Sequence, residues 1–281
     1  MGLGFFNGKY IPLDEPVIPI EERGHQFGDG VYEMIRVYKG KPFKLNEHVE
    51  RLFNSANAIN LPLENDKSYF IDLILHTIKV SGLLECTVYL QITRGIATRN
   101  HIFPDVPVSI SMTVKEITPL DPALYENGVN VIFHEDERWA NCYIKSLNLL
   151  PNVLARQKAN EKGCFEAILY RDEWVTEGSS SNVFIVKNGI VYTTPLSKRI
   201  LEGVTRGVVI QICKKHDIHS IEKSFTKNQL LDADEVFITN TTGEIIPIVK
   251  VDNVKIGPGI PGKVTKRLHR LFIQEIMNEI G

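Results

Sequence analysis

Cysteine is scarce in this chain of 281 residues, and the few cysteines present form no motif. Cys86, Cys142, Cys164 and Cys213 stand far apart and make no C-x-x-C pair. This spacing argues against a structural zinc site or a dithiol redox motif, so we expect no metal centre. Free thiols are typical of a reducing compartment, which predicts a cytoplasmic protein.

Other absences narrow the class of protein further. No apolar run approaches membrane-spanning length, and the N-terminus MGLGFFNGKY lacks the basic segment and apolar core of a signal peptide. The net charge of −2 leaves no broad basic surface for nucleic acid. No HExxH, G-x-S-x-G or Walker A motif occurs. We therefore expect a protein that binds neither membranes nor nucleic acid and acts on small molecules.

The hydrophobic pattern predicts helices and strands that are clustered rather than strictly alternating, which favours an α+β fold. Apolar side chains at helical spacing begin after Asn46, the expected N-cap of the first long helix. The expected helices are 46–59, 66–82, 147–163, 205–216 and one from 263. The expected strands include 31–38, 86–95, 106–114, 129–135, 165–172, 173–178, 182–195 (a hairpin that turns at Asn188-Gly189) and 235–240.

A proline-rich segment suggests where the chain divides into domains. EITPLDPAL carries two prolines in nine residues, as inter-domain linkers often do. We predict a small N-terminal α+β domain over 1–115, a linker over 116–123 and a larger C-terminal domain over 124–281. Lys145 falls in the last of these.

Lys145 is the first candidate for chemistry, because it stands in a mostly apolar stretch between Ile144 and Leu147. A lysine that forms an imine must spend time as the neutral amine, whereas a free lysine has a pKa near ~10.4. Apolar surroundings and nearby positive charge favour the neutral form. A strand-end lysine that reaches into water fits the same pattern equally well.

Two further segments carry polar groups of interest. Glu177 opens the cluster EGSSSN, where a carboxylate can face the pyridine nitrogen of pyridoxal phosphate (PLP) and hold it protonated. Val204 and Thr205 begin a helix whose free N–H groups make a ready phosphate site. Asn240 and Thr241 follow a strand and offer further hydrogen-bond donors.

Taken together and in order, these motifs resemble the fold-type IV family of PLP enzymes. The resemblance spans RGHQFGDGVYE, NEHVERL, IKSLNLL, EGSSSN, LEGVTR and ITNTTGE, which is nearly the whole chain. It implies Lys145 as the Schiff-base lysine and proton-transfer catalyst, and Glu177 as partner of the pyridine nitrogen. The phosphate contacts implied are Arg51, Val204, Thr205 and Thr241, with Asn240 beside them, and Leu201 is implied to pack behind the ring. It also implies a homodimer in which the partner subunit lends some site residues.

Within that family the sequence is most similar to D-amino-acid transaminases. Arg99 and His101 stand two apart, so an extended backbone would turn both side chains to one side. With Tyr32 they match that group's trap for the substrate carboxylate, and all three can donate hydrogen bonds to one carboxylate. Two positions depart from that pattern: Arg36 is an arginine that branched-chain transaminases often show, and Asn240 replaces a serine.

The activity expected is ping-pong transamination between a D-amino acid such as D-alanine and a 2-oxo acid such as 2-oxoglutarate. Arg36 keeps an L-branched-chain aminotransferase open as an alternative, and an aminodeoxychorismate lyase of the same family is another. A protein that binds no PLP and keeps the pocket for small anions is the alternative from a different class.

Overall fold

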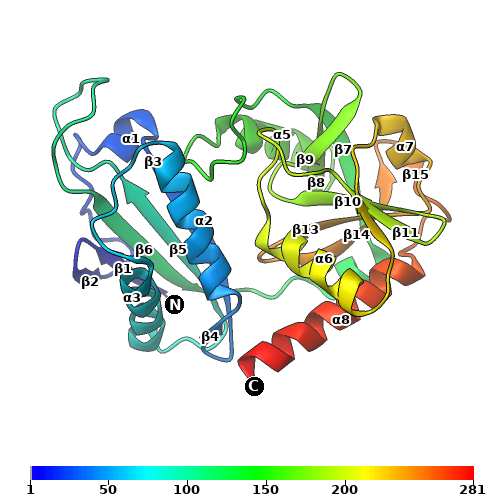
Figure 1. Ribbon diagram of the computed structural model, residues 1–281, viewed down its shortest axis with the longest axis horizontal. Helices are drawn as coiled ribbons and strands as arrows, with labels where there is room; N and C mark the ends of the chain where they lie inside the picture. The colour runs from blue at the N-terminus through cyan, green and yellow to red at the C-terminus, as the bar shows by residue number, and fades with distance from the viewer. Residues whose placement is uncertain (1) are drawn as a thin grey trace. The chain divides into compact units, whose positions relative to one another are not determined.

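The computed structural model describes residues 2–281, which form two compact units (Figure 1). Unit 1 runs from the N-terminal part of the chain to Thr118 and also includes Ile144–Asn148 and Glu279–Gly281. Unit 2 comprises Pro119–Tyr143 and Leu149–Asn278. The expected division placed Lys145 in the C-terminal domain, but the short segment around it belongs to unit 1. The reason is a set of backbone hydrogen bonds to a strand of that unit, described below.

Unit 1 is built on an antiparallel sheet, six-stranded over the described residues, with the order β2-β1-β6-β5-β3-β4. Its strands are β1 (Gly2–Phe6), β2 (Lys9–Ile11), β3 (Gly30–Tyr38), β4 (Lys41–Pro42), β5 (Cys86–Thr93) and β6 (Ser109–Glu116). Its helices are α1 (Arg23–Phe27), α2 (Leu45–Ala58) and α3 (Lys67–Ser81). Strand β5 alternates buried and half-buried residues, as a sheet covered on one face requires.

Helices α2 and α3 supply the cover of the unit 1 sheet. Leu52 of α2 and Ile74 of α3 share one apolar core with Val88 and Leu90 of β5 and Val31 of β3. Figure 1 shows α2 lying across the strands of this sheet. Apolar side chains three and four residues apart on each helix produce this arrangement, because they form one stripe along the helix.

The predicted N-cap of α2 is wrong. The helix begins at Leu45, and its cap residue is Lys44, which has a left-handed backbone with φ 54°. The backbone N–H of Lys44 donates to Oε1 of Glu279, 2.8 Å away within the same unit. Lys44 makes no side-chain cap hydrogen bond of the kind expected from Asn46, and a carboxylate distant in sequence fixes the backbone at the start of the helix instead.

Unit 2 is built on a mixed sheet, nine-stranded over the described residues, with the order β12-β11-β10-β13-β14-β7-β8-β9 and β15 paired to β14. Its strands are β7 (Val129–Glu135), β8 (Glu166–Arg171), β9 (Trp174–Gly178), β10 (Asn182–Lys187), β11 (Ile190–Thr193), β12 (Ser220–Glu222), β13 (Glu235–Asn240), β14 (Glu244–Val251) and β15 (Val254–Lys255). Its helices are α4 (Ala123–Asn127), α5 (Leu150–Glu161), α6 (Val204–Lys215), α7 (Lys227–Leu231) and α8 (Lys263–Ile280).

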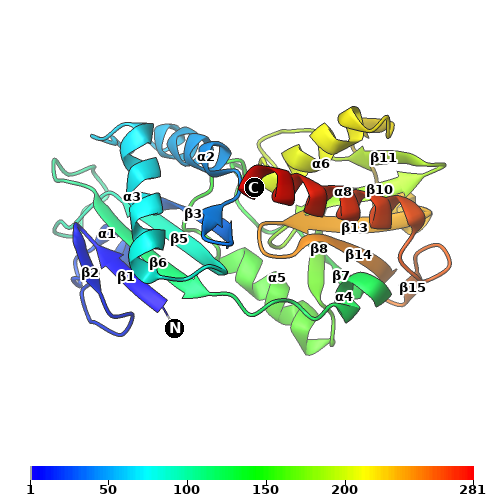
Figure 2. The same ribbon diagram turned by 90° about the horizontal axis from the view of Figure 1, so that it is seen from below.

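The central strands β10 and β13 of this second sheet are buried on both faces. Val183 and Ile185 of β10 enter one core, while the alternate residue Phe184 stacks on Phe237 of β13 with ring centroids 4.8 Å apart. Figure 2 shows α6 and α8 running along the same side of β10 and β13. This covering explains why β10 has no alternating pattern, since strands buried on both faces are nearly continuously apolar.

Candidate active site

Lys145 is fixed by its backbone to β3 and α2. The N–H of Tyr32 donates to the carbonyl oxygen of Lys145 at 3.0 Å, and the N–H of Leu147 donates to that of Gly30 at 3.1 Å. The N–H of Lys145 itself donates to Oγ of Ser55 at 3.1 Å. These bonds attach the lysine-bearing segment to unit 1 and fix where its side chain starts.

The amine of Lys145 lies beside an aromatic ring. Its Nζ is 4.1 Å from the centroid of the Tyr32 ring, and the side chain is half-buried. Tyr32 also contacts Tyr89, whose pKa burial raises to about 12, with a smaller contribution from the Tyr32 hydroxyl. The structure therefore brings together Tyr32 and Lys145, two of the residues predicted to act on the substrate.

Arg51 is also placed near this segment, on α2. Its Nε donates to Oε1 of Glu33 at 2.7 Å and its Nη2 to Oε2 at 2.8 Å, and Nδ1 of His48 lies 2.7 Å from the same Oε2. Arg51 and Ser55 are one helical turn apart, so they share a face of α2. The guanidinium predicted to hold a phosphate is thus oriented by a carboxylate that the sequence analysis had not singled out.

Burial sets the electrostatics of this group. Burial alone would raise the pKa of Glu33, but Arg51 and then His48 outweigh it and hold that pKa well below its ordinary value. The pKa of His48 is lowered, chiefly by burial, with the positive charges of Arg51 and Lys145 contributing. His48 is therefore neutral at pH 7, and Glu33 is the counter-charge of Arg51.

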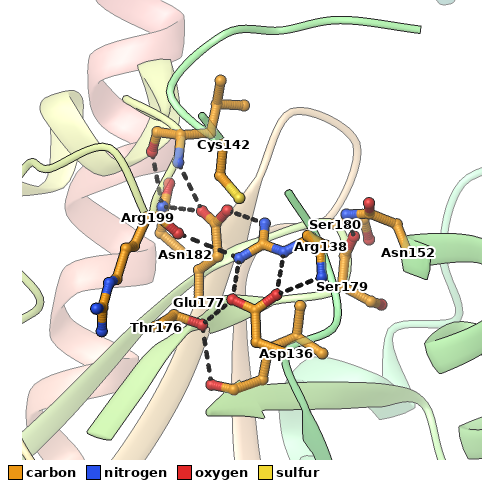
Figure 3. A network of polar contacts seen from close by, with 12 residues as sticks. Asp136, Arg138, Cys142, Asn152, Thr176, Glu177, Ser179, Ser180, Asn182 and Arg199 are labelled. Atoms are coloured by element: carbon orange, nitrogen blue, oxygen red, sulfur yellow. Dashed lines mark hydrogen bonds and ion pairs between the residues drawn. The ribbon is translucent and has the colours of Figure 1, made fainter. Parts of the chain in front are cut away.

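In unit 2, Glu177 is a buried carboxylate held from three directions (Figure 3). Its Oε2 accepts hydrogen bonds from Nδ2 of Asn182 and from the backbone N–H of Leu201, both at 3.0 Å. Its Oε1 accepts a hydrogen bond from Nη1 of Arg138, whose side chain is 7% exposed. Burial raises the pKa of Glu177, and the adjacent Arg138 opposes that rise.

The N-terminus of α6 lies next to this carboxylate. Gly203 is the N-cap residue, and a Cβ atom there would come 1.9 Å from Oδ1 of Asn182. Because glycine has no side chain, it cannot cap the helix. The first N–H groups, those of Val204 and Thr205 among them, have no acceptor within the helix. This terminus suits an anion such as phosphate.

Two further predicted residues stand at the end of β13. Asn182 of β10 pairs in register with Thr239, so Asn240, the last residue of β13, and then Thr241 come directly after the residue paired with Asn182. Oδ1 of Asn240 accepts hydrogen bonds from the N–H groups of Thr242 and Gly243 and so closes the β13–β14 turn. This side chain shapes the loop that carries Thr241.

The side chains of Arg99 and His101 both contact Phe27, the last residue of α1. The Cζ of Arg99 lies 4.2 Å from the ring centroid of Phe27, the His101 ring lies 5.4 Å from it, and Nη1 of Arg99 donates to the Gln26 carbonyl at 3.3 Å. The backbone around them bends and is not extended as expected. The shared contact with Phe27, rather than strand geometry, brings the two exposed side chains together.

Arg36 has a structural position inside unit 1. Its Nη2 donates to Oε2 of Glu85 at 2.6 Å, and its Nη1 donates to the carbonyl oxygens of Val37 and Cys86 at 2.8 and 3.1 Å. The guanidinium also lies 4.4 Å from the Tyr38 ring centroid. These partners account for a buried arginine without any substrate.

Sequence reasoning missed the residues that hold the predicted ones. Glu33, His48 and Asn182 lie inside motifs that had been recognised but were given no role. Arg138 and Ser55 had no local signal, since their partners Glu177 and Lys145 are 39 and 90 positions away in sequence.

Among residues 2–281, no group of three or more His, Cys, Asp or Glu side chains is arranged to hold a metal ion. Over the same range, no helix combines the length and the apolar character needed to cross a bilayer.

Comparison with known proteins identifies the family. Residues 30–251 match the model of the family Amino-transferase class IV. The chain is 42% identical over 275 residues to the D-alanine aminotransferase of Bacillus licheniformis, covering 98% of this chain and 97% of the relative. It is 43% identical over 271 residues to that of Staphylococcus haemolyticus, covering 95% of each.

Solved structures agree on the fold. The branched-chain amino acid aminotransferase of Escherichia coli superposes with a TM-score of 0.90 at 25% identity, over 97% of this chain and 93% of that one. The branched-chain aminotransferase of Thermoproteus uzoniensis gives 0.88 at 26% identity, over 98% of this chain and 95% of that one. A further branched-chain amino acid aminotransferase, solved with pyridoxamine 5'-phosphate, gives 0.90 at 28% identity, over 97% of this chain and 93% of that one. This chain belongs to the class IV amino-transferase family and has its two-domain α+β fold, fold type IV.

Proposed function

We propose that this enzyme transfers an amino group between a D-amino acid, such as D-alanine, and a 2-oxo acid, such as 2-oxoglutarate, with pyridoxal 5'-phosphate as cofactor. The observation that carries the proposal is the buried carboxylate of Glu177, fixed by three N–H donors beside an uncapped helix N-terminus. The identity of 42–43% to D-alanine aminotransferases over nearly the whole chain supports the choice of substrate.

The residues present fit the cofactor. The absence of a Cβ at Gly203 lets the Asn182 side chain, which also holds Glu177, approach the start of α6, and the N–H groups of Val204 and Thr205 can donate to a phosphate there. Thr241 can add a further donor, and the resemblance to the family assigns Arg51 of unit 1 as another phosphate ligand. Glu177 is a suitable acceptor for a protonated ring nitrogen, and Leu201, whose N–H binds Glu177, is the residue to pack beside the ring.

Each protein group then has a defined task. When bound, PLP supplies an electron sink that stabilises negative charge at the α-carbon of the amino acid. Lys145 would hold the cofactor covalently, and its Nζ would accept and return the α-proton of the amino acid. Its fixed backbone sets the reach of that amine. Glu177 keeps the ring nitrogen protonated, which makes the sink effective.

The substrate carboxylate is assigned to Arg99, His101 and Tyr32. A guanidinium, an imidazole and a phenol can all donate hydrogen bonds to one carboxylate. The internal ion pair of Arg36 with Glu85 supports the D-amino acid assignment, because it gives that arginine a role unrelated to an L-branched-chain substrate. Alternating use of amino donor and oxo acceptor at one site gives ping-pong kinetics.

The assignment of Lys145 is tested by reductive labelling. Borohydride added to cofactor-saturated protein should fix the cofactor to Lys145, which peptide mass mapping would locate. Lys145→Ala should bind PLP without the covalent link and lose turnover. Lys198→Ala, at an exposed position, should keep the covalent link and the turnover. A label on another lysine, or turnover at the normal rate in Lys145→Ala, would overturn the assignment.

A second experiment tests the substrate. D-alanine and L-leucine are supplied separately, each with 2-oxoglutarate, and the glutamate formed is measured together with its chirality. D-glutamate from D-alanine alone supports the proposal, and L-glutamate from L-leucine contradicts it. Release of pyruvate from aminodeoxychorismate without an amino acceptor would instead indicate a lyase. A colourless protein that stays unchanged after PLP is added would indicate an anion-binding protein.

We also place the enzyme in the cytoplasm as a homodimer. The four cysteines carry free thiols, as expected in a reducing compartment. Helix α5 exposes three apolar side chains on one face, as surfaces that contact another subunit do. These are Leu150, Val153 and Leu154, at positions i, i+3 and i+4, which are 68%, 58% and 54% exposed. Light scattering of the purified enzyme should give twice the chain mass of 31.8 kDa, and a single chain mass would contradict the dimer.

A further inference from the structure

Arg138 stands at the centre of a buried charge network that includes Glu177 (Figure 3). Asp136 grips it with both oxygens: Nε of Arg138 donates to Oδ1 and Nη2 donates to Oδ2, each at 2.8 Å. The Asp136 side chain is fully buried, and Thr176 Oγ1 donates to its Oδ2 at 2.9 Å. This two-point grip leaves Nη1 directed at Glu177.

Further contacts hold the arrangement in place. Nη2 of Arg138 also donates to the carbonyl oxygen of Arg199 at 3.2 Å. The guanidinium of Arg171 lies 3.4 Å from Oδ2 of Asp136 and adds a second positive charge. The positive charges of Arg138 and Arg171 thus balance the negative charges of Asp136 and Glu177. A network of this kind has one low-energy arrangement, because moving any member leaves a charge buried without its partner.

Arg138 affects Glu177 in two ways. It fixes one oxygen of the carboxylate, while Asn182 and Leu201 fix the other. Its positive charge also opposes the rise that burial causes in the pKa of Glu177. The negative charge of Asp136 raises that pKa further, and Arg138 opposes this effect as well. A carboxylate held ionised by an arginine is a weaker base toward any third partner.

We propose that Arg138, locked by Asp136, is a positioning residue that fixes the Glu177 carboxylate and limits how strongly it keeps a proton on the pyridine nitrogen of the cofactor. This inference rests on the proposed role of Glu177. Without Arg138, the pair formed by Glu177 and the ring nitrogen loses a neighbouring positive charge. It should therefore keep its proton to a higher pH.

The test measures that proton directly in the holoenzyme loaded with PLP labelled with ¹⁵N in the ring. The ¹⁵N chemical shift is followed against pH in the wild type, Arg138→Met, Arg138→Lys and Glu177→Gln. We expect the ring nitrogen of Arg138→Met to stay protonated to a pH about one unit higher, which is a tenfold change in proton affinity. Arg138→Lys, which keeps the charge but not the two-point grip, should fall between.

The controls separate this inference from the proposed function. Arg36→Met removes another buried, ion-paired arginine and should leave the ¹⁵N titration unchanged. If Glu177→Gln also leaves it unchanged, Glu177 does not face the ring nitrogen and the proposed role fails. If Glu177→Gln moves it while Arg138→Met titrates like the wild type, only the inference about Arg138 is overturned.

Urea unfolding of the cofactor-free protein gives a readout that needs no bound cofactor. Arg138→Met should unfold at a lower urea concentration than the double variant Arg138→Met/Glu177→Gln, since the second change removes the charge left buried without a partner. Additive effects of the two changes would overturn the coupling. If Arg138→Met does not fold, Asp136→Asn replaces it in the ¹⁵N titration with the opposite direction expected, because it keeps the positive charge of Arg138 beside Glu177 and removes the opposing negative charge. A titration of Asp136→Asn like that of the wild type would overturn the inference.

Discussion

The backbone N–H of Lys145 donates to the hydroxyl of Ser55 on α2, one helical turn from Arg51. This bond ties the segment that carries the amine of Lys145 to the helix that carries a predicted phosphate ligand. The two groups of unit 1 that we propose to hold the cofactor thus depend on one helix face. A shift of that helix would move the lysine and the arginine together.

Ser55→Ala should therefore reduce turnover without removing any group that contacts the substrate. The change leaves the N–H of Lys145 without its acceptor, a loss of about 1–3 kcal/mol when the group is buried. Stopped-flow measurement of the half-reaction with D-alanine should show a lower rate, with the cofactor still bound. Ser81→Ala is the matched control, because Ser81 also accepts a backbone N–H, that of Leu83, but in α3. Equal effects of the two changes would contradict a special role for Ser55.

Gly203→Ala should weaken cofactor binding through the start of α6. Its Cβ would come 1.9 Å from Oδ1 of Asn182, so either the helix terminus or the Asn182 side chain must move. Because Asn182 also holds Glu177, we expect the Kd for PLP, measured by titrating the cofactor-free protein, to rise at least about tenfold, or ~1.4 kcal/mol.

Gly207→Ala is the control within the same helix. A Cβ at Gly207 meets nothing within 4 Å, so this change should keep the affinity for PLP. It should also raise helix stability by roughly 0.5–1 kcal/mol, since alanine is favoured over glycine inside a helix. A similar loss of PLP affinity in both variants would show that the helix as a whole, and not its terminus, is responsible.

Local patterns were enough to predict most of the long elements. Helical spacing predicted α2, α3 and α6, and the Asn188-Gly189 turn predicted the β10–β11 hairpin, where both residues have positive φ values of 51° and 77°. Strand β14 was not predicted, because Pro247 interrupts its apolar run and proline is unusual inside a sheet. In the structure Pro247 pairs with Phe237 of β13, and the pairing of β14 with β7 shifts register between Ile248 and Lys250.

Short motifs were enough to propose site residues, but not the tertiary contacts that hold them. Glu177 and Thr205 stand in segments whose composition suggests a role for each, and these roles stay predictions. The two-point grip of Asp136 on Arg138 joins residues that are close in sequence. Its proposed effect on Glu177 could not be predicted, because Glu177 comes beside Arg138 only in the folded structure. A contact between distant residues leaves no periodic trace in the sequence.

Arg36→Gln should lower stability and leave substrate preference unchanged. The change removes the ion pair with Glu85 and the bonds to two carbonyl oxygens, so we expect a loss of about 1–3 kcal/mol in the free energy of unfolding. The ratio of activities with D-alanine and L-leucine should stay that of the wild type. A changed ratio, with stability intact, would mean that Arg36 contacts substrate after all. Arg99→Ala is the contrasting variant and should raise the KM for D-alanine.

Glu33→Gln should destabilise unit 1 in a pH-dependent way. The change leaves Arg51 buried without its counter-charge, which costs about 3–5 kcal/mol when one partner of a buried pair is removed. The pKa of Glu33 lies below its ordinary value of 4.5 in the folded protein, because Arg51 and His48 outweigh the effect of burial. Its contribution is therefore complete above the unfolded pKa and is lost as the pH falls toward the folded one.

Urea unfolding of the cofactor-free wild type and Glu33→Gln, at intervals from about pH 3.5 to pH 8, measures this contribution. The difference in unfolding free energy should stay constant above about pH 5.5 and shrink below about pH 4.5. Glu47→Gln, an exposed position on the same helix, should show a small difference throughout. The double variant Glu33→Gln/Arg51→Met should recover part of the lost stability, because it removes the unpaired charge. A pH-independent difference would mean that Glu33 stabilises the fold by packing and not by its charge.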